Sequence, residues 1–446
     1  MSETRIRPKE RDAIIQSLRS GVVPRIGQQH IQVGRAEEVK ALLRDIERIA
    51  DGGSTVRFII GEYGSGKTFF LNLIRSVALE KRLVTVHADL TPDRRIHATG
   101  GQARALYAEL MHNMATRAKP DGGALASVIE RFVSTALTDA RDRAISPDLV
   151  IQERLANLSE MVGGYDFAQV IAAYWKGHDS GNDGHKADAI RWMRGEFSTK
   201  TDARNALGVR TIIDDANIYD HLKLMARFVR LGGYDGLLVG LDEAVNLYKL
   251  ANSQARNSNY EQILRILNDC LQGVAVGVGF LIAGTPEFML DTRKGLYSYP
   301  ALQSRLAENV FATDGLVDLS GPVLRLANLS PEDLFVLLQK IRLVYRSDDS
   351  HQLNLEDEGL KAFMSHCSQR IGDAYFKTPR NTIVAFVNML AVLEQNPRVK
   401  WVDLIEQVDV PAERNPDFDP LPDDDGEATA PAASGEEEDE LSSFRL

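Results

Sequence analysis

The chain has 446 residues, of which 44% are hydrophobic and 26% are charged, and its formal net charge is −11. These proportions are typical of a globular protein with one large or two to three ordinary domains. No apolar run approaches the roughly 18 residues that a membrane span needs, and no signal-peptide pattern is seen, so we expect neither a membrane-spanning nor a secreted protein. The two cysteines, Cys270 and Cys367, are far apart, as expected for buried thiols in a reducing compartment. We therefore expect a cytoplasmic protein with no membrane partner.

The acidic charge is concentrated at the carboxyl end. Residues 411–446 hold twelve acidic and two basic side chains, a balance of −10 that leaves about −1 for the rest of the chain. This segment is rich in Pro, Asp, Glu, Ala and Gly and cannot bury a core, so we expect a disordered, solvating tail. Binding of a basic partner through Asp423–Asp425 or Glu436–Glu440 is the alternative. Because the body is nearly neutral, a local basic patch remains compatible with the composition.

Two helices are predicted before the first strand. Apolar residues at helical spacing predict a helix through Ile14–Leu18, which Gly21–Pro24 ends, and we treat residues 1–30 as an N-terminal helical segment. A second helix is predicted through Val39–Ile46, where apolar residues again recur at helical spacing.

A glycine-rich phosphate-binding pattern, G-x-x-x-x-G-K-[ST], follows the β-rich run Val56–Ile60 and precedes an amphipathic helix. Its positions are Gly61, Glu62, Tyr63, Gly64, Ser65, Gly66, Lys67 and Thr68. In such a loop the backbone N–H groups and the helix dipole face the phosphates of a nucleotide. The lysine contacts the β- and γ-phosphates, and the threonine hydroxyl ligates Mg²⁺. The sequence therefore predicts a nucleotide site with Mg²⁺.

A second strand is predicted at Leu83–Ala88, in which we interpret His87 as a structural residue. Residues 100–231 then carry mostly helical patterns and far exceed the length of a strand crossover, which predicts a helical insertion. Aromatic and basic residues come together in this insertion, at Tyr174–Lys176 and Arg191–Arg194. They form either a nucleic-acid or partner surface or, in the reading we favour, ordinary core with a solvated rim.

Two further buried strands end in polar residues. Leu237–Leu241 leads into Asp242 and Glu243, which suits a parallel strand that delivers two carboxylates to the phosphate loop. Asp242 would hold the Mg²⁺ hydration shell, and Glu243 would orient or deprotonate the attacking water. Val276–Gly284 ends in Thr285, whose hydroxyl either contacts the γ-phosphate or water, or simply lies in the turn before a proline.

The last strand is predicted at Val323–Leu329, and Ser330–Asp333 is a strong helix start. Three helical patterns follow, which predict a small helical lid over residues 330–410 with Arg380 near the start of its third helix. Between Thr285 and the last strand lies Arg305, with Arg293 as a competing position. Both arginines, and Arg380, have an alternative interpretation as surface residues.

In their order along the chain, these features resemble an AAA+ ATPase over about residues 31–408. The resemblance implies an α/β nucleotide domain formed by residues 31–99 and 232–329, with a five-stranded parallel sheet in the order 5-1-4-3-2. It also implies that Thr285 is the sensor-1 residue, that Arg305 is an arginine finger inserted into a neighbouring subunit's site, and that Arg380 is the sensor-2 arginine. Three residues would help to hold the adenine, because a V-G-R-x-x-E stretch stands here before the phosphate loop: Val33, Gly34 and Arg35. The alternative is a plain capped helix start with Arg35 on the surface.

Several longer stretches resemble the BrxD family of ATP-binding proteins from bacteriophage-exclusion (BREX) defence systems, and the likeness runs nearly end to end. They are Gly61–Leu71, Asp89–Pro92, Pro120–Leu125, Gly236–Glu243 and Gly284–Phe288. The resemblance implies a prokaryotic phage-defence role and assembly as a homo-oligomer or with other proteins of the system. Relatives of the origin-recognition type carry a winged helix after the lid, whereas this chain becomes acidic soon after Leu404.

The favoured hypothesis is an ATP-hydrolysing AAA+ protein that remodels or loads a defence complex, with DNA as a further candidate partner. A nucleotide-gated interaction protein, in which ATP orders the lid and hydrolysis resets it, is the first alternative. A DNA-binding loader of the origin-recognition type is the second, and salt-dependent duplex binding would distinguish it.

Overall fold

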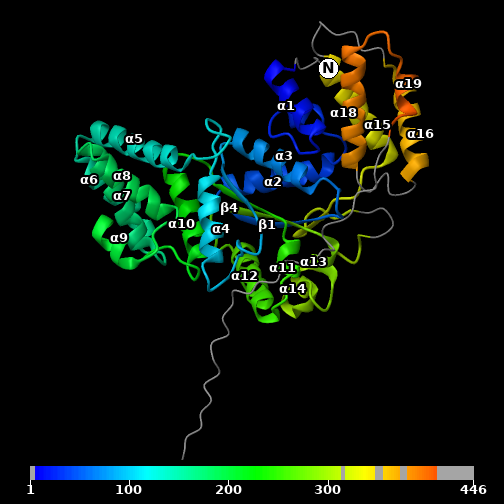
Figure 1. Cartoon of the computed structure of the whole chain (residues 1–446). Helices are drawn as coiled ribbons and strands as arrows, with labels where there is room; N and C mark the ends of the chain where they lie inside the picture. The colour runs from blue at the N-terminus through cyan, green and yellow to red at the C-terminus, as the bar shows by residue number, and fades with distance from the viewer. Residues whose placement is uncertain (1–5, 313–316, 347–354, 372–378, 409–446) are drawn as a thin grey trace, which may run out of the picture.

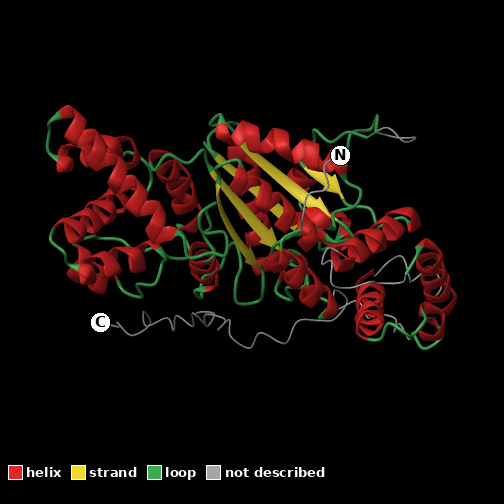
Figure 2. Cartoon of the chain, turned by 90° about the horizontal axis from the view of Figure 1, so that it is seen from above, coloured by secondary structure: helices red, strands yellow, loops and turns green. Residues whose placement is uncertain are grey.

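The computed structural model describes residues 6–312, 317–346, 355–371 and 379–408. A parallel sheet lies in the middle of the molecule, with helices on its two faces (Figures 1 and 2). Its strands are β1 (Ser54–Ile60), β2 (Val84–Asp89), β3 (Leu237–Asp242), β4 (Val278–Gly284) and β5 (Val323–Arg325). The predicted acidic tail and the end of the predicted lid, at residues 409 and 410, lie outside the described residues.

All four strand pairings are parallel, and the strand order is β2-β3-β4-β1-β5. This confirms the predicted five-stranded parallel sheet and its order. Strands β1 and β4 are buried along their whole length, because helices cover both faces of a parallel sheet. The register places Asp89 beside Asp242 at the carboxyl ends of β2 and β3. Two polar strand ends therefore meet at one edge of the sheet.

The last strand is shorter than predicted. The pattern extended it to Leu329, but β5 ends at Arg325, and the Leu326 N–H makes one more hydrogen bond, to the Ile60 carbonyl at 2.7 Å. At the next residue, Ala327, the carbonyl accepts a hydrogen bond from Arg35 rather than from a neighbouring strand. The apolar pattern thus continues beyond the last residue that pairs with β1.

Helices α2 (Ala36–Ala50) and α3 (Lys67–Glu80) pack on one face of the sheet. A buried ion pair also ties α2 to β1, with Arg57 Nε 2.6 Å from Asp45 Oδ2 and both side chains less than a tenth exposed. Arg57 Nη2 donates a second hydrogen bond to the same carboxylate. Removing one partner of a buried pair leaves an uncompensated charge, so this contact fixes how α2 sits against the strand that leads to the phosphate loop.

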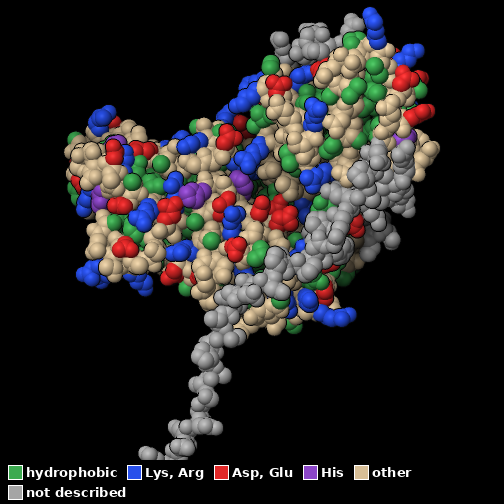
Figure 3. All heavy atoms as spheres, viewed as in Figure 1, with side chains coloured by type: hydrophobic (Ala, Val, Ile, Leu, Met, Phe, Trp, Pro, Cys, Tyr) green, Lys and Arg blue, Asp and Glu red, His purple; other side chains and the backbone are tan. Residues whose placement is uncertain are grey.

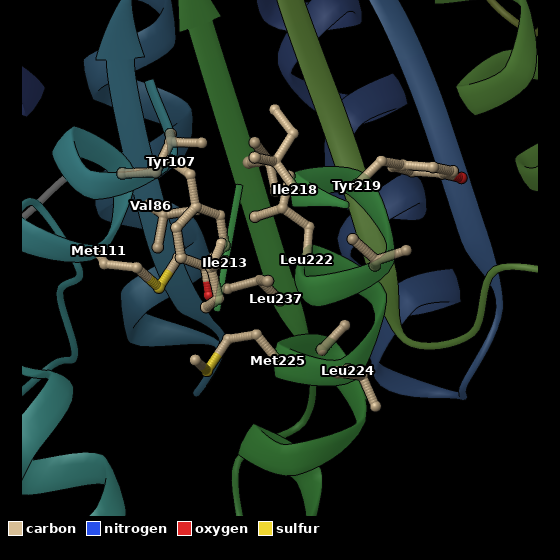
Figure 4. Packing of buried hydrophobic residues seen from close by; sticks show 14 of the residues in the cluster. Val86, Tyr107, Met111, Ile213, Ile218, Tyr219, Leu222, Leu224, Met225 and Leu237 are labelled. Carbon is tan, nitrogen blue, oxygen red and sulfur yellow. The ribbon is translucent and has the colours of Figure 1, made fainter. Parts of the chain in front are cut away.

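The segment between β2 and β3 is helical, as predicted for the insertion. Its helices are α4 (Gln102–His112), α5 (Leu125–Arg143), α6 (Pro147–Ser159), α7 (Gly164–Asp179), α8 (Asp183–Met193), α9 (Lys200–Leu207) and α10 (Ile218–Leu231). Side chains of α4 and α10 pack directly on Val86 of β2 and Leu237 of β3 (Figure 4). The aromatic side chains Tyr174, Trp175 and Trp192 are at most 5% exposed. They belong to the core, in agreement with the interpretation favoured from the sequence.

After β3 the chain forms α11 (Val245–Tyr248), α12 (Ser253–Leu271), α13 (Pro286–Leu290) and α14 (Pro300–Leu306). Beyond β5 come the helices of the predicted lid, α15 (Pro331–Arg346), α16 (Asp357–Ile371), α18 (Pro379–Gln395) and α19 (Trp401–Ile405). Figures 1 and 2 place these lid helices at the opposite end of the molecule from the insertion.

The first helix, α1 (Pro8–Arg19), packs against the lid helices α15 and α18. Its buried residues Ile14 and Leu18 share one apolar cluster with Leu338, Phe386 and Leu390 of the lid. Arg11 adds an ion pair with Glu394, at 3.0 Å. Sequence patterns predicted the helix but not its partner, because periodicity identifies an apolar face without showing what covers it. The two ends of the described chain therefore share one small core.

Within the described residues, no helix is long and apolar enough to cross a membrane.

Candidate nucleotide-binding site

The glycine-rich loop joins β1 to α3, as its flanking patterns predicted. Gly64 and Gly66 have φ angles of 78° and 83°, a region that side chains with a Cβ rarely adopt. At Gly61 the constraint is space, because a Cβ would lie 2.4 Å from Ser65 Oγ and 2.9 Å from the Leu326 carbonyl oxygen. A Cβ at Gly66 would meet no atom within 4 Å. The glycines therefore serve two purposes, left-handed turns at two positions and close packing at the third.

Lys67 begins α3 and folds back over the loop. Its Nζ donates hydrogen bonds to the carbonyl oxygens of Gly61, at 2.9 Å, and Glu62, at 3.0 Å. The Glu62 carboxylate in turn accepts a hydrogen bond from the side-chain amide of Asn328, at 3.0 Å. The ammonium group is thus held at the centre of the loop, and a phosphate group bound there would meet it directly.

Thr68 and the end of β3 form the central contact of the site. The Thr68 hydroxyl donates a hydrogen bond of 2.7 Å to Asp242 Oδ2, and the backbone N–H of Glu243 donates one of 2.8 Å to Oδ1 of the same carboxylate. Glu243 has a φ angle of 57°, a strained value for a residue with a side chain. Two elements that are 174 residues apart in sequence therefore present a hydroxyl and a carboxylate to the same point.

A cavity of about 870 Å³ extends from this point. Its wall includes the phosphate loop from Tyr63 onward, the polar ends of β2 and β3, and apolar side chains of the lid and the N-terminal segment. With the residues just before α2 and α15, this apolar group is Leu18, Val22, Val23, Pro24, Ile31, Val33, Leu329, Leu337, Pro379 and Ile383. Such a volume, mostly apolar with a few converging polar groups, is characteristic of small-ligand sites.

Arg35 lies on this wall but is held by the protein backbone. Its Nη2 donates hydrogen bonds to the carbonyl oxygen of Ser65 in the loop and to that of Ala327 after β5, the latter at 3.0 Å. Burial lowers the pKa of Arg35, and Glu38 and Asp333 partly offset that effect. A Cβ on neighbouring Gly34 would lie 3.3 Å from the Asp333 carboxylate of α15. The V-G-R stretch therefore connects the phosphate loop to the first lid helix.

The three other residues predicted for catalysis are in different surroundings. Arg380 of α18 lines the cavity near Gly21. Thr285 caps α13, its hydroxyl accepting a 3.4 Å hydrogen bond from the Phe288 N–H, and it is not among the described residues that line the cavity. Arg305, on α14, is also outside the lining, and it donates hydrogen bonds to Asn268 Oδ1, at 2.7 Å, and to the Ala301 carbonyl, at 2.8 Å. The competing Arg293 is exposed in the loop after α13.

The cavity also includes polar residues to which the sequence analysis gave no role in the site: Arg25, Arg75, His87 and Asp89. Loss of hydration raises the pKa of Asp89, and the neighbouring Asp242 raises it further. Alternation along β2 would have placed His87 and Asp89 on one face of the strand, since residues two apart point the same way. No sequence signal identifies Arg25, because its position depends on how the N-terminal segment crosses α3.

A parallel five-stranded sheet with a glycine-rich loop at a strand-to-helix junction, beside a cavity of this size, defines a nucleotide-binding α/β protein. A family model for the BREX system ATP-binding proteins BrxC/D matches residues 6–409. The chain therefore belongs to this family of ATP-binding proteins of the BREX phage-defence system, in agreement with the resemblance seen in the sequence. No curated protein matches the chain.

Proposed function

We propose that this protein is an AAA+ ATPase that hydrolyses Mg²⁺-bound ATP to remodel or load a BREX defence complex. The observation that carries the proposal is the 2.7 Å contact between Thr68 and Asp242, next to Glu243. A hydroxyl and a carboxylate are hard oxygen ligands, which suit Mg²⁺. Thr68 and Asp242 would hold the ion, and Mg²⁺ would neutralise the charge that develops on the transferred phosphoryl group.

The remaining roles follow from placement. The Lys67 ammonium, now bonded to the carbonyls of Gly61 and Glu62, would exchange these contacts for the β- and γ-phosphates. Glu243 would orient the attacking water and accept its proton, and the backbone N–H that it donates to Asp242 fixes its position beside the metal ligand. The adenine would lie among the apolar residues of the cavity, with Val33 and Gly34 near the base and Arg35 holding the loop.

Roles for the remaining three residues depend on motion or assembly. Arg380 lines the cavity from the lid, and it would contact the γ-phosphate if the lid rotated toward the phosphate loop. Thr285 could donate its hydroxyl proton to the γ-phosphate or the water while still accepting from Phe288, since a hydroxyl does both. Arg305 would have to leave Asn268 before it entered a neighbouring subunit's site.

The direct test is ATP turnover by the Glu243→Gln variant of the full chain. We expect turnover to fall by about 10²–10⁴-fold, the usual contribution of general acid–base catalysis, with ATP affinity nearly unchanged. Glu261→Gln is the matched control, because Glu261 is exposed on α12 and outside the cavity lining. Undiminished turnover by Glu243→Gln would refute the assigned chemistry.

A further inference from the structure

A second polar region of the cavity lies beside α3, away from the phosphate loop. Arg75 comes eight residues after Lys67 on this helix, or about 12 Å along it at 1.5 Å per residue. Its guanidinium points toward β2, because Nε donates to Thr85 Oγ1 at 3.4 Å and Nη2 donates to the Pro120 carbonyl oxygen. Arg75 is therefore directed away from the place of the γ-phosphate.

Arg25 and His87 line the same cavity as Arg75. All three residues line it, and the short 3₁₀ helix Gln28–His30, just after Arg25, packs on α3. Arg25 is exposed, and no described residue forms a hydrogen bond or ion pair with its guanidinium, whereas the Nδ1 of His87 is buried and has no hydrogen-bond partner. Figure 3 shows Lys, Arg and His side chains, with Asp and Glu side chains among them, along the hollow between the insertion and the part formed by the lid and α1.

The charges of this group do not balance. Arg25 lowers the pKa of Arg75, and both arginines lower the pKa of His87, in each case after the larger effect of burial. Asp121 is the one carboxylate that opposes the effect on Arg75. Arg75 is fixed against β2 by Thr85, two residues before His87, and the exposed Arg25 lines the same cavity, so an anion between the two guanidinium groups would reduce their repulsion.

We propose that Arg25, Arg75 and His87 form a second anion site, which binds a phosphate group at a place distinct from the nucleotide's phosphates. Guanidinium groups recognise phosphate oxygens in pairs, and the imidazole Nδ1 adds a third contact point for a tetrahedral ligand. The phosphate group belongs either to a nucleic-acid backbone or to a free phosphate. Because Arg25 follows α1, which shares the core of the lid, a bound anion also holds the lid against α3.

The test measures anion binding to the full chain while saturating ADP occupies the phosphate loop, with ADP binding confirmed independently. The probes are inorganic phosphate, by calorimetry, and a labelled 20-nucleotide single-stranded DNA, by fluorescence anisotropy. Arg25→Gln weakens binding of at least one probe by about tenfold or more, the usual effect of losing a charge-assisted contact. Arg25→Glu weakens it further, because the new carboxylate pairs with Arg75 in place of the ligand.

Arg141→Gln is the matched control, since Arg141 is an exposed arginine on α5 and outside the cavity lining. For DNA, Arg25→Gln also reduces the slope of log affinity against log salt concentration by about 1, as expected for one lost phosphate contact. DNA binding that depends on Arg25 identifies a nucleic-acid ligand, and dependence for inorganic phosphate alone identifies a free phosphate. Binding of neither probe, or equal binding by Arg25→Gln and wild type, overturns the proposal. If ADP does not bind, that result counts against the proposed nucleotide site alone. The phosphate and DNA measurements are then made without ADP, and they still test the anion site.

Discussion

Arg35 has two possible roles, a direct contact with the nucleotide or a structural contact that supports the phosphate loop, and a substitution can distinguish them. The sequence interpretation places its side chain at the adenine, whereas the structure shows it bonded to the carbonyls of Ser65 and Ala327. Replacing it with alanine removes both bonds and separates the phosphate loop from the segment that leads into α15. We therefore expect Arg35→Ala to destabilise the protein even when no nucleotide is bound.

The magnitude follows from the two lost bonds. Hydrogen bonds to charged groups contribute about 1.5–3 kcal/mol each when buried. Since Arg35 is only partly buried, we take about 1 kcal/mol for each bond, or about 2 kcal/mol in total. Domains of 150–250 residues lose about 2–4 °C of melting temperature per kcal/mol, which gives a decrease of about 4–8 °C.

The assay is thermal unfolding of the nucleotide-free protein, paired with a measurement of ATP affinity. Arg44→Ala is the matched control, because Arg44 lies exposed on α2, the helix that Arg35 immediately precedes, and should change stability by less than about 0.5 kcal/mol. Arg35→Lys should lie between wild type and Arg35→Ala, since the lysine ammonium stands one atom closer to the backbone than Nη2, the single nitrogen that bonds both carbonyls. An unchanged melting temperature together with weaker ATP binding would refute the structural role and support the adenine contact.

Two further predictions concern the same cavity. Gly61→Ala should abolish ATP binding and lower the melting temperature, because the new Cβ would lie 2.4 Å from Ser65 Oγ and 2.9 Å from a backbone oxygen. At Gly66 the new Cβ meets open space, so Gly66→Ala should lower the stability by only about 1 kcal/mol, the cost of its positive φ. Equal effects of the two variants in unfolding and ATP-binding assays would contradict this prediction. Burial is the largest effect on His87, and repulsion from Arg75 and Arg25 adds to it, so that its pKa is lowered to about 4. The imidazole is therefore protonated below about pH 6.5 in the unfolded chain but only below about pH 4 in the folded protein. As the pH drops from 6.5 to 4, the free energy of unfolding should therefore fall by up to about 3 kcal/mol more in wild type than in His87→Gln. If denaturation experiments show the same pH dependence for both proteins across that range, His87 does not titrate in this way.

Much of the fold was predictable because its elements are marked locally. Short apolar runs that end in Gly, Asp or Thr predicted the buried parallel strands, and β1, β3 and β4 lie where these runs stand. The order of the strands followed from a family resemblance, which the sheet confirms. The extent of β5 was wrong, because an apolar pattern continues through Leu326–Leu329 whether or not a neighbouring strand is present to pair with it.

The phosphate loop and the two carboxylates were predictable for the same reason, whereas the predicted Thr285 and Arg305 are not among the described residues that line the cavity. Gly61–Thr68 could be identified from sequence alone because glycines, lysine and threonine must stand at fixed spacing for a backbone to surround phosphates. Asp242 and Glu243 could be identified because they end a buried strand. That Thr68 and Asp242 meet at 2.7 Å is a property of the folded sheet, since 174 residues separate them in the chain.

The sequence by itself determined a nucleotide-binding α/β protein of the BREX family, because these signals are short-range and their chemistry allows few substitutes. Only the tertiary structure decided which distant segments of the chain contact one another. It joined α1 to the lid, turned Arg35 toward backbone carbonyls, and placed Arg25, Arg75 and His87 on the wall of one cavity. The physical reason is that periodicity and spacing describe one segment at a time, whereas a shared core or a shared cavity depends on which segments the fold places side by side.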